Sequence, residues 1–430
     1  MRIGKRVAVT MVAAGLAATL AACSSTGTPE SSGTPSSSSG EIKLEFWTIN
    51  LKEGYTPYID GLIKAYEAKN PKVKVTWVDI SDYQQTQSRL LAALTSGESP
   101  DVVNVTPFIL PLLADKKTVL PLSKIGPTDS IAADYTEGFW NAGVLDGEAY
   151  AVPYYGSSSA LLYNKSLFEK AGLDPAKPPT TWDEVFAAAK TIHAKTGKAG
   201  FVQTLDDFND AGNTADILAS QAGVPLLAGD NKKATFNTPQ AAAYFDNYVT
   251  GVKDGWISKT SINGVTLDGG KEFAQGEVAM MFNGPWLLRW LETNSSPEVF
   301  KQIGLASHPK SPTGKVNAFL QQLAIPAGSK NPEQALDFAR YVSGTVIELA
   351  KSAAVLPTKK QDVANPEYLS LFGADVLTSQ PIEFFWPKVP TEAKLLESLR
   401  LQMQAALLGK KSSTQALDDA AKEWDAILAE

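Results

Sequence analysis

The chain has 430 residues, of which 44% are hydrophobic and 20% are charged. Its length favours two domains or more and is sufficient to bury a large core. Lys and Arg number 39 against 46 Asp and Glu, and no block or stripe is rich in basic residues, so nucleic acid is not expected as a partner.

Residues 1–22 have the features of a secretory signal. Arg2, Lys5 and Arg6 precede an apolar run that leads through small residues into Cys23. A charged start, a short apolar segment and a small-residue cleavage site are typical of such signals. The run is shorter than the roughly 20 apolar residues that span a bilayer. We therefore expect this segment to be removed and not to form a membrane helix.

Cys23 is the only cysteine of the chain, and Leu20-Ala21-Ala22 before it resembles the bacterial lipobox. This resemblance implies that Cys23 is lipidated and becomes the mature N-terminus. Two or more acyl chains on one residue anchor a protein stably, whereas a single chain binds only marginally. A lipidated Cys23 leaves no thiol for a disulfide, so the fold must rely on its core.

The segment that follows is a predicted tether. From Ser24 to Gly40 every residue except Glu30 is Ser, Thr, Gly or Pro, a composition typical of a flexible linker. With Cys23 it makes up the anchoring segment 23–40. Ser24 stands where an Asp would favour retention at the inner membrane, so we expect a lipid anchor on a Gram-positive cell surface. Without the three basic residues of the signal, 36 Lys and Arg remain against 46 Asp and Glu, a net charge of −10.

The next residues alternate between strand and helix patterns. Apolar residues recur with a period of two over 44–48 and 73–77, form a short run over 101–105, and recur at helical spacing over 59–66 and 83–94. This βαβαβ order predicts an α/β domain around a largely parallel sheet. Ligands of such sheets bind beyond the carboxyl ends of the strands, so the loops after the first and third strands form a candidate site.

The C-terminal residues form a helical pattern. Leu417, Ala421, Trp424 and Leu428 share one helix face, with Ser412–Ser413 positioned as caps. Trp424 is therefore predicted to pack in a core and to have no ligand role.

Motifs for catalysis or metal binding are missing from the sequence. His193 and His308 are the only histidines, and neither has partners at metal-ligand spacing. No GxSxG, P-loop or GxGxxG motif occurs, so we expect no cofactor. A surface carbohydrate-active enzyme stays open as an alternative, because any two of the many Asp and Glu could form a catalytic pair. A surface adhesion or scaffold protein, which would expose a large apolar patch, is a further alternative.

Short motifs spread over nearly the whole mature chain carry a resemblance to one family. They are Ser96-Gly-Glu-Ser-Pro-Asp101, the segment Tyr150–Phe168, Ala171-Gly-Leu, Thr181-Trp-Asp-Glu-Val, Phe273-Ala-Gln-Gly-Glu-Val-Ala-Met280, Asn283-Gly-Pro-Trp286, Lys330-Asn-Pro-Glu-Gln-Ala335 and Leu356-Pro-Thr358. In this order, and with the lipobox, they resemble the family 1 extracellular solute-binding proteins, which include the maltose-binding protein. The resemblance implies a monomeric, non-catalytic protein that captures a sugar or oligosaccharide and delivers it to the membrane permease subunits of an ABC importer.

The resemblance also implies an architecture of the periplasmic-binding-protein type. Two α/β lobes would be joined by a multi-crossing hinge, with the ligand in the cleft between them, and would close around it. By this comparison the crossings fall near Tyr155, Gln321 and Pro357. Lobe one would comprise residues 41–155 plus 321–356, and lobe two residues 156–320 plus 357–430.

The chemistry of a sugar indicates which residues would hold it. A pyranose presents C–H groups on its faces and hydroxyls around its rim, which suit aromatic rings and fixed polar groups respectively. The resemblance implies that Trp286, in the Gly-Pro-Trp motif, stacks on a sugar ring; a core tryptophan is its alternative. The other candidates are Trp47, Asn50, Lys52 and Glu53 at the end of the first strand, Tyr83 and Gln84 before the second helix, Asn104 after the third strand, Tyr155 and Ser157 at the first crossing, Asp207 in a polar loop, Gln321 at the second crossing, and Trp386 in an aromatic cluster.

Several of these positions leave the ligand open. Lys52, Glu53 and Asp207 are explained nearly as well by a solvated surface. Ser157 stands where the maltose-binding pattern has a glutamate, so maltose itself does not follow. Some relatives bind glycerol phosphodiesters, which would need a cluster of cations or N–H donors, and Lys52 is the one cation we expect near the cleft. A glycerol-phosphodiester-binding importer subunit is therefore the less favoured alternative.

Overall fold

The order of strands and helices from Ile42 onward follows the sequence patterns. The computed structural model describes residues 40–80, 83–96, 99–205, 213–371 and 373–430, and residues Glu41–Glu430 form one compact unit. Its first elements are β1 (Ile42–Ile49), α1 (Lys52–Lys69), β2 (Val73–Ile80), α2 (Tyr83–Ser96) and β3 (Val102–Val105). The predicted βαβαβ unit is confirmed.

The main sheet is mixed, whereas the sequence predicted a largely parallel one. Its strand order is β11-β6-β10-β3-β1-β2, and β12 (Ile382–Glu383) pairs with β10. The strands of the βαβαβ unit are parallel. Beyond them each pairing is antiparallel: β10 (Val316–Ala324) with β3, β6 (Ala151–Ser158) with β10, and β11 (Leu356–Pro357) with β6. These three come from distant parts of the chain, so the local βαβ rule does not set their direction.

A second sheet continues directly from the first. Only Ser159 separates β6 from β7 (Ala160–Asn164), which pairs with β8 (Met280–Asn283) and β9 (Ile303–Ser307). In the main sheet Tyr155 of β6 lies opposite both Gln321 of β10 and Pro357 of β11. The register of β10 shifts between Gln321 and Gln322, as in a β-bulge.

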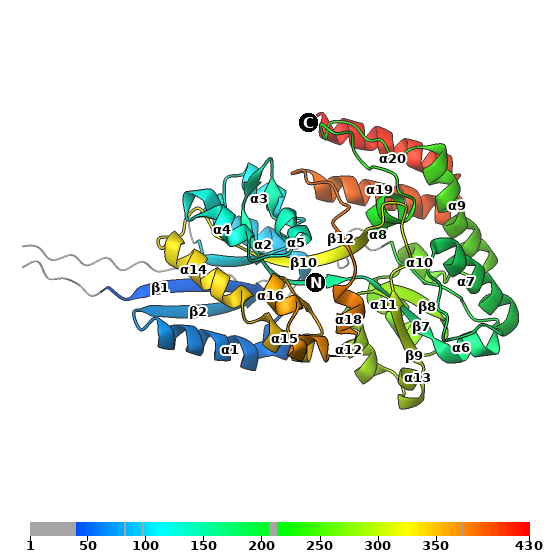
Figure 1. The fold of residues 1–430 in the computed structure, drawn as a ribbon. Helices are drawn as coiled ribbons and strands as arrows, with labels where there is room; N and C mark the ends of the chain where they lie inside the picture. Colours follow the sequence, from blue (N-terminus) through cyan, green and yellow to red (C-terminus); the bar gives the residue numbers. More distant parts are fainter. Residues whose placement is uncertain (1–39, 81–82, 97–98, 206–212, 372) are drawn as a thin grey trace, which may run out of the picture. The chain divides into compact units, whose positions relative to one another are not determined.

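Helices and short elements fill the remaining chain (Figure 1). Between β3 and β6 lie α3 (Leu110–Asp115), η1 (Leu122–Lys124), α4 (Thr128–Ala132), α5 (Glu137–Ala142), β4 (Val144–Leu145) and β5 (Glu148–Ala149). Between β7 and β10 lie α6 (Lys165–Lys170), α7 (Trp182–Thr196), α8 (Asn213–Ala215), η2 (Asp216–Gln221), α9 (Pro239–Asp254), α10 (Thr260–Asn263), α11 (Thr266–Ala274), α12 (Pro285–Asn294) and α13 (Pro297–Lys301). After β10 come α14 (Pro332–Ser343), α15 (Val346–Ala353), α16 (Lys360–Val363), α17 (Pro366–Leu369), α18 (Ala374–Thr378), α19 (Glu392–Leu407) and α20 (Ser413–Leu428).

Two large cores correspond to the two sheets. One face of the main sheet packs on α1, α14 and α15 through residues such as Phe46, Tyr66 and Phe338, and α2 and α3 cover the other face. Tyr368 and Ala374, which follow β11, belong to the first of these cores. The second large core joins β7 and β8 to α7, α9, α19 and α20. Within the described part of the chain, no helix combines the length and apolar character needed to cross a membrane.

The C-terminal helix packs as its sequence predicted. Trp424 is fully buried in the second core, where its indole N–H donates to the Leu395 carbonyl at 2.6 Å. Ser412 caps α20 by accepting a hydrogen bond from the Gln415 N–H. Both observations confirm a structural role for this segment.

Asp79 fixes the connection between β1 and α1, where one of the predicted ligand loops lies. Its carboxylate accepts hydrogen bonds from the Thr48 hydroxyl at 2.5 Å and from the backbone N–H groups of Leu51 and Lys52 at 3.0 Å each. These N–H groups lie at the start of α1 and have no partner within the helix, so a carboxylate stabilises them as a cap does.

We therefore expect Asp79→Ala to lower the free energy of unfolding by about 1–2 kcal/mol, as measured by urea denaturation. The matched control is Asp60→Ala, on the exposed face of α1, which should change it by less than about 0.5 kcal/mol. Equal stability of the two variants would contradict the capping role of Asp79.

Candidate functional site

A cavity of about 300 Å³ opens where the main sheet meets α12 and α15. Asn50, Tyr155, Ser157, Trp286 and Gln321, five of the residues singled out in the sequence, line it together. Its other lining residues are mainly apolar: Ile49, Leu51, Tyr55, Gly156, Phe319, Leu349, Ala353, Ala354 and Val355. The cavity thus brings together residues that are more than 270 positions apart in the chain.

The β1–α1 loop presents Asn50 to this cavity. Asn50 is exposed and has a φ of 53°, a left-handed conformation that Asn tolerates better than most residues. The Asp79 carboxylate accepts hydrogen bonds from the backbone N–H groups of Leu51 and Lys52, which follow Asn50, and so fixes the C-terminal end of this turn.

Gln321 is held from behind by the main sheet. The Asn104 amide N–H donates to the Gln321 side-chain oxygen at 2.5 Å and to the Gln322 carbonyl at 3.2 Å. Gln321 is 3% exposed and Asn104 2% exposed, so the bond is shielded from water. Asn104 therefore positions Gln321 and does not itself line this cavity.

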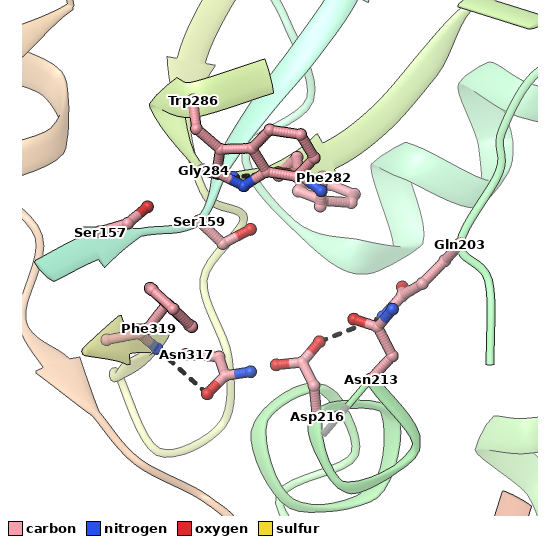
Figure 2. Close-up of a pocket in the computed structure, with 12 residues that line it drawn as sticks. Ser157, Ser159, Gln203, Asn213, Asp216, Phe282, Gly284, Trp286, Asn317 and Phe319 are labelled. Atoms are coloured by element: carbon pink, nitrogen blue, oxygen red, sulfur yellow. Dashed lines mark hydrogen bonds between the residues drawn. The ribbon is translucent and has the colours of Figure 1, made fainter. Parts of the chain in front are cut away.

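A smaller cavity of about 50 Å³ adjoins the larger one (Figure 2). Ser157, Trp286 and Phe319 line both cavities, so these residues form a shared wall. The smaller cavity is richer in polar groups, and its remaining lining residues are Ser159, Gln203, Asn213, Asp216, Phe282, Asn283, Gly284, Asn317 and Ala318.

Trp286 reaches the shared wall because α12 begins beside β6. Gly284 precedes the helix, and a Cβ on it would lie 2.2 Å from the Ser157 hydroxyl oxygen, so no other residue fits without a shift. Pro285 then occupies the first helical turn, where its missing N–H costs nothing. The Gly-Pro-Trp motif therefore has a local physical reason: it sets the indole of Trp286 close to Ser157.

Among the described residues, Asp216 is the one acidic residue that lines the two cavities, and neither is lined by a Lys, Arg or His. It is 5% exposed and starts the π-helical segment η2, a rare geometry that is frequent at functional sites. Its Oδ2 accepts hydrogen bonds from the side-chain amides of Gln221 at 2.7 Å and Gln203 at 3.3 Å, whereas its Oδ1 has no hydrogen-bond partner within the described part of the chain. Burial raises the pKa of Asp216 above its ordinary value.

Aromatic rings back the smaller cavity. Phe282 lies 4.6 Å from Trp182 and 5.0 Å from His308, measured between ring centroids. His308 is buried, and burial lowers its pKa while the nearby charge of Asp216 acts in the opposite direction. A neutral imidazole behind Phe282 leaves the carboxylate without a full counter-charge.

The remaining predicted residues with described side chains lie outside the two cavities. Trp47 packs against the core under α2 and α3 and donates to the Glu45 carboxylate. Lys52 and Glu53 are exposed at the start of α1. Trp386 is 4% exposed and stacks on Phe108, with the ring centroids 4.6 Å apart.

Four further predictions concern residues of which the structure says less. Tyr83 and Gln84 begin α2, but their side chains lie outside the described part. Asp207 and Cys23 fall in segments outside the described residues. Among the residues that are described, no group of His, Cys, Asp and Glu could hold a metal ion.

Sequence reasoning missed most of the smaller cavity. The clearest signal for it was Asp216 itself, a lone carboxylate in the apolar run Ala215-Asp216-Ile217-Leu218-Ala219. Asn283 stood within a motif already noted, next to the Gly-Pro-Trp sequence. Gln203, Asn213 and Asn317 gave no such signal, because polar residues in loops and at strand ends are common.

The chain resembles proteins that bind solutes outside the cytoplasm. A protein named as a binding protein of Brucella abortus (strain 2308) is 27% identical over 404 residues, which cover 91% of this chain and 94% of that one. The sn-glycerol-3-phosphate-binding periplasmic protein UgpB of the same strain is 25% identical over 415 residues, covering 89% and 92%. Among solved structures, a Synechococcus sp. MITs9220 protein assigned as a periplasmic oligosaccharide-binding protein superposes with a TM-score of 0.79 at 26% identity, covering 90% of this chain and 99% of its own.

This similarity extends to a family profile. Residues 51–346 match the bacterial extracellular solute-binding proteins, and this stretch includes Trp286, Asp216 and both strands that carry Tyr155 and Gln321. The fold is accordingly the two-lobed α/β fold of periplasmic binding proteins. The chain belongs to the bacterial extracellular solute-binding protein family.

Proposed function

We propose that this protein captures a sugar or oligosaccharide and delivers it to the permease subunits of an ABC importer. The observation that carries the proposal is the shared wall of the two cavities, where the Trp286 ring stands among hydroxyl, amide and carboxylate groups. An aromatic face with a polar surround matches the apolar faces and hydroxyl rim of a pyranose. The similar Synechococcus protein, assigned to oligosaccharides, supports the same ligand class.

A glycerol phosphodiester or glycerol phosphate is the second candidate, because of the similarity to UgpB. Phosphate recognition in a buried site calls for Arg, Lys or several N–H donors. Neither of the two cavities is lined by a Lys or an Arg, and the smaller one is lined by Asp216. A buried carboxylate repels a phosphate, so the sugar is the better fit.

The family binds solutes and is not a family of enzymes, and it acts outside the cytoplasm. We propose in addition that this protein has no catalytic activity and acts as a monomer. We also propose that Cys23 is lipidated after removal of residues 1–22 and that the Ser/Thr/Gly/Pro segment tethers the protein to a Gram-positive cell surface. The support for the anchor is the lipobox-like Leu20-Ala21-Ala22-Cys23 sequence.

We further propose that the protein closes around its ligand about the strands β6, β10 and β11. Tyr155, Gln321 and Pro357 lie side by side in the register, next to the bulge of β10. The sequence predicted lobes of 41–155 plus 321–356 and of 156–320 plus 357–430. Because Tyr368 and Ala374 pack with the first core, we propose instead that the third crossing lies after Ala374, so that lobe one includes residues 321–374.

Trp286→Ala tests the sugar site. The chain from Ser24 onward, which includes the whole compact unit Glu41–Glu430, is screened by thermal shift against mono- and oligosaccharides and sn-glycerol 3-phosphate. A sugar at about 1,000 times its dissociation constant should stabilise the protein by roughly 4 kcal/mol. Calorimetry should then show that Trp286→Ala weakens this sugar at least about tenfold, because its ring face is lost.

Trp290→Ala is the matched control. Trp290 lies on the same helix and packs against the same small cluster, but it lines neither cavity. It should leave the affinity within about twofold. A shift with sn-glycerol 3-phosphate alone would overturn the sugar and keep the transport role, and hydrolysis of a sugar detected by chromatography would favour an enzyme.

A further inference from the structure

The unpartnered oxygen of Asp216 faces a matching donor across the smaller cavity. Figure 2 shows an oxygen of Asp216 and the side-chain amide of Asn317 turned toward one another. No hydrogen bond joins them, and Asp216 Oδ1 has no partner among the residues that the structure describes. The two groups therefore present an acceptor and an amide to the same space.

The orientation of the carboxylate is fixed by a buried network. The Tyr248 hydroxyl lies 2.7 Å from the side-chain oxygen of Gln221 and 2.8 Å from that of Gln203 and can donate its one proton to either, and Tyr244 donates to Gln221 at 2.9 Å. With its oxygen occupied in this way, the Gln221 amide can only turn its N–H groups to Asp216. Burial raises the pKa of both tyrosines well above the ordinary value, so they stay donors. The network occupies Oδ2 and leaves Oδ1 for the cavity.

The orientation of the Asn317 amide is fixed as well. Its Oδ1 accepts the backbone N–H of Ala318 at 3.1 Å, so Nδ2 is the end that points away from the strand. This Nδ2 makes no hydrogen bond to any residue that the structure describes, and Asn317 is half-buried. A donor, Asn317 Nδ2, and an acceptor, Asp216 Oδ1, thus face each other, and each can form a further hydrogen bond.

A hydroxyl has the hydrogen-bonding capacity that both groups need. It can donate to Asp216 Oδ1 and accept from Asn317 Nδ2 at once, which neither an ammonium group nor an ionised phosphate oxygen can do. An ammonium has no lone pair for the amide, and an ionised phosphate oxygen has no proton for the carboxylate. Hydrogen bonds to an ionised partner are also the stronger ones.

We propose that Asp216 and Asn317 form a subsite that binds one hydroxyl of an uncharged sugar as a bridge between them and excludes anionic ligands. The inference rests on the proposed sugar-binding function and names the group by which the site selects its ligand. Among the described residues Oδ1 is a buried acceptor without a partner, and the ligand hydroxyl supplies that partner.

An exchange of the two side chains tests the bridge. The probes are D-glucose, D-galactose, D-mannose, maltose, trehalose and raffinose, and the tightest binder is titrated by calorimetry into wild type, Asp216→Asn, Asn317→Asp and the double variant. Each single variant should weaken binding about tenfold to a hundredfold. The double variant should recover most of the lost affinity, because it still presents one carboxylate and one amide, with their positions exchanged.

Controls separate this inference from the proposed function. Asp254→Asn, exposed at the end of α9, should bind like wild type. Two results would overturn the bridge and leave sugar binding intact. In the first, the affinity for a sugar depends on Trp286 but is unchanged in Asp216→Asn. In the second, the affinity of the double variant falls by the product of the two single-variant losses. Tighter binding of sn-glycerol 3-phosphate than of any of the six sugars would overturn both.

A readout without ligand covers the case of a variant that folds poorly. Besides burial, the side chains that act on the Asp216 carboxylate are His308, Gln221, Gln203 and Ser220. Its charge in turn helps to raise the pKa of Tyr244 and Tyr248. The pKa of Asp216 in the folded state is raised above 3.8. Between pH 3.8 and that raised pKa the folded state holds a proton that the unfolded chain has already lost. Stability therefore decreases as the pH rises through this range.

Asp216→Asn keeps an oxygen for Gln221 and removes the charge, so the ligand-free variant should melt higher than wild type at pH 7. The difference in melting temperature between Asp216→Asn and wild type should shrink as the pH falls toward 3.8. A variant that melts lower than wild type at pH 7 would show that Asp216 stabilises the free protein and would contradict an acceptor held ready for a ligand.

Discussion

The pairing of β6 with β10 is the constraint on which the rest of the molecule depends. Both strands belong to the main sheet, and β6 passes through Ser159 directly into the second sheet. Because the side-chain period of a strand is two, the register fixes which residues face a core and which face the cavities. Tyr154 is fully buried in the first core, whereas Tyr155, which borders the same core, and Ser157 line the larger cavity. A slip of one residue would turn Tyr154 toward the cavity in place of Tyr155.

The cavities owe their chemistry to groups that the surrounding structure holds in place. Asn104 holds Gln321, Asp79 holds the loop of Asn50, and the close approach at Gly284 sets Trp286 beside Ser157. Among the groups that line the cavities, Asp216 lowers the stability of the ligand-free protein, because it is a buried carboxylate with one oxygen that lacks a described partner. Such a group persists where a ligand offsets its cost, which is the physical case for a binding site.

The sequence was informative where local patterns decide the structure. The βαβαβ unit, the cap at Ser412 and the buried Trp424 all follow from periodicity and capping. It was misleading about the direction of the added strands, because β10 and β11 join the sheet from more than 200 residues away from β1. It also could not find Gln203 and Asn317, whose proximity to Asp216 depends on how the elements of the second sheet meet β10.

The most direct test is a crystal structure of the protein with the tightest binder among D-glucose, D-galactose, D-mannose, maltose, trehalose and raffinose. We expect a pyranose ring against Trp286 on the shared wall of the two cavities, with one hydroxyl between Asp216 Oδ1 and Asn317 Nδ2. A sugar bound away from Trp286, or one that leaves the space between Asp216 and Asn317 to water, would contradict it.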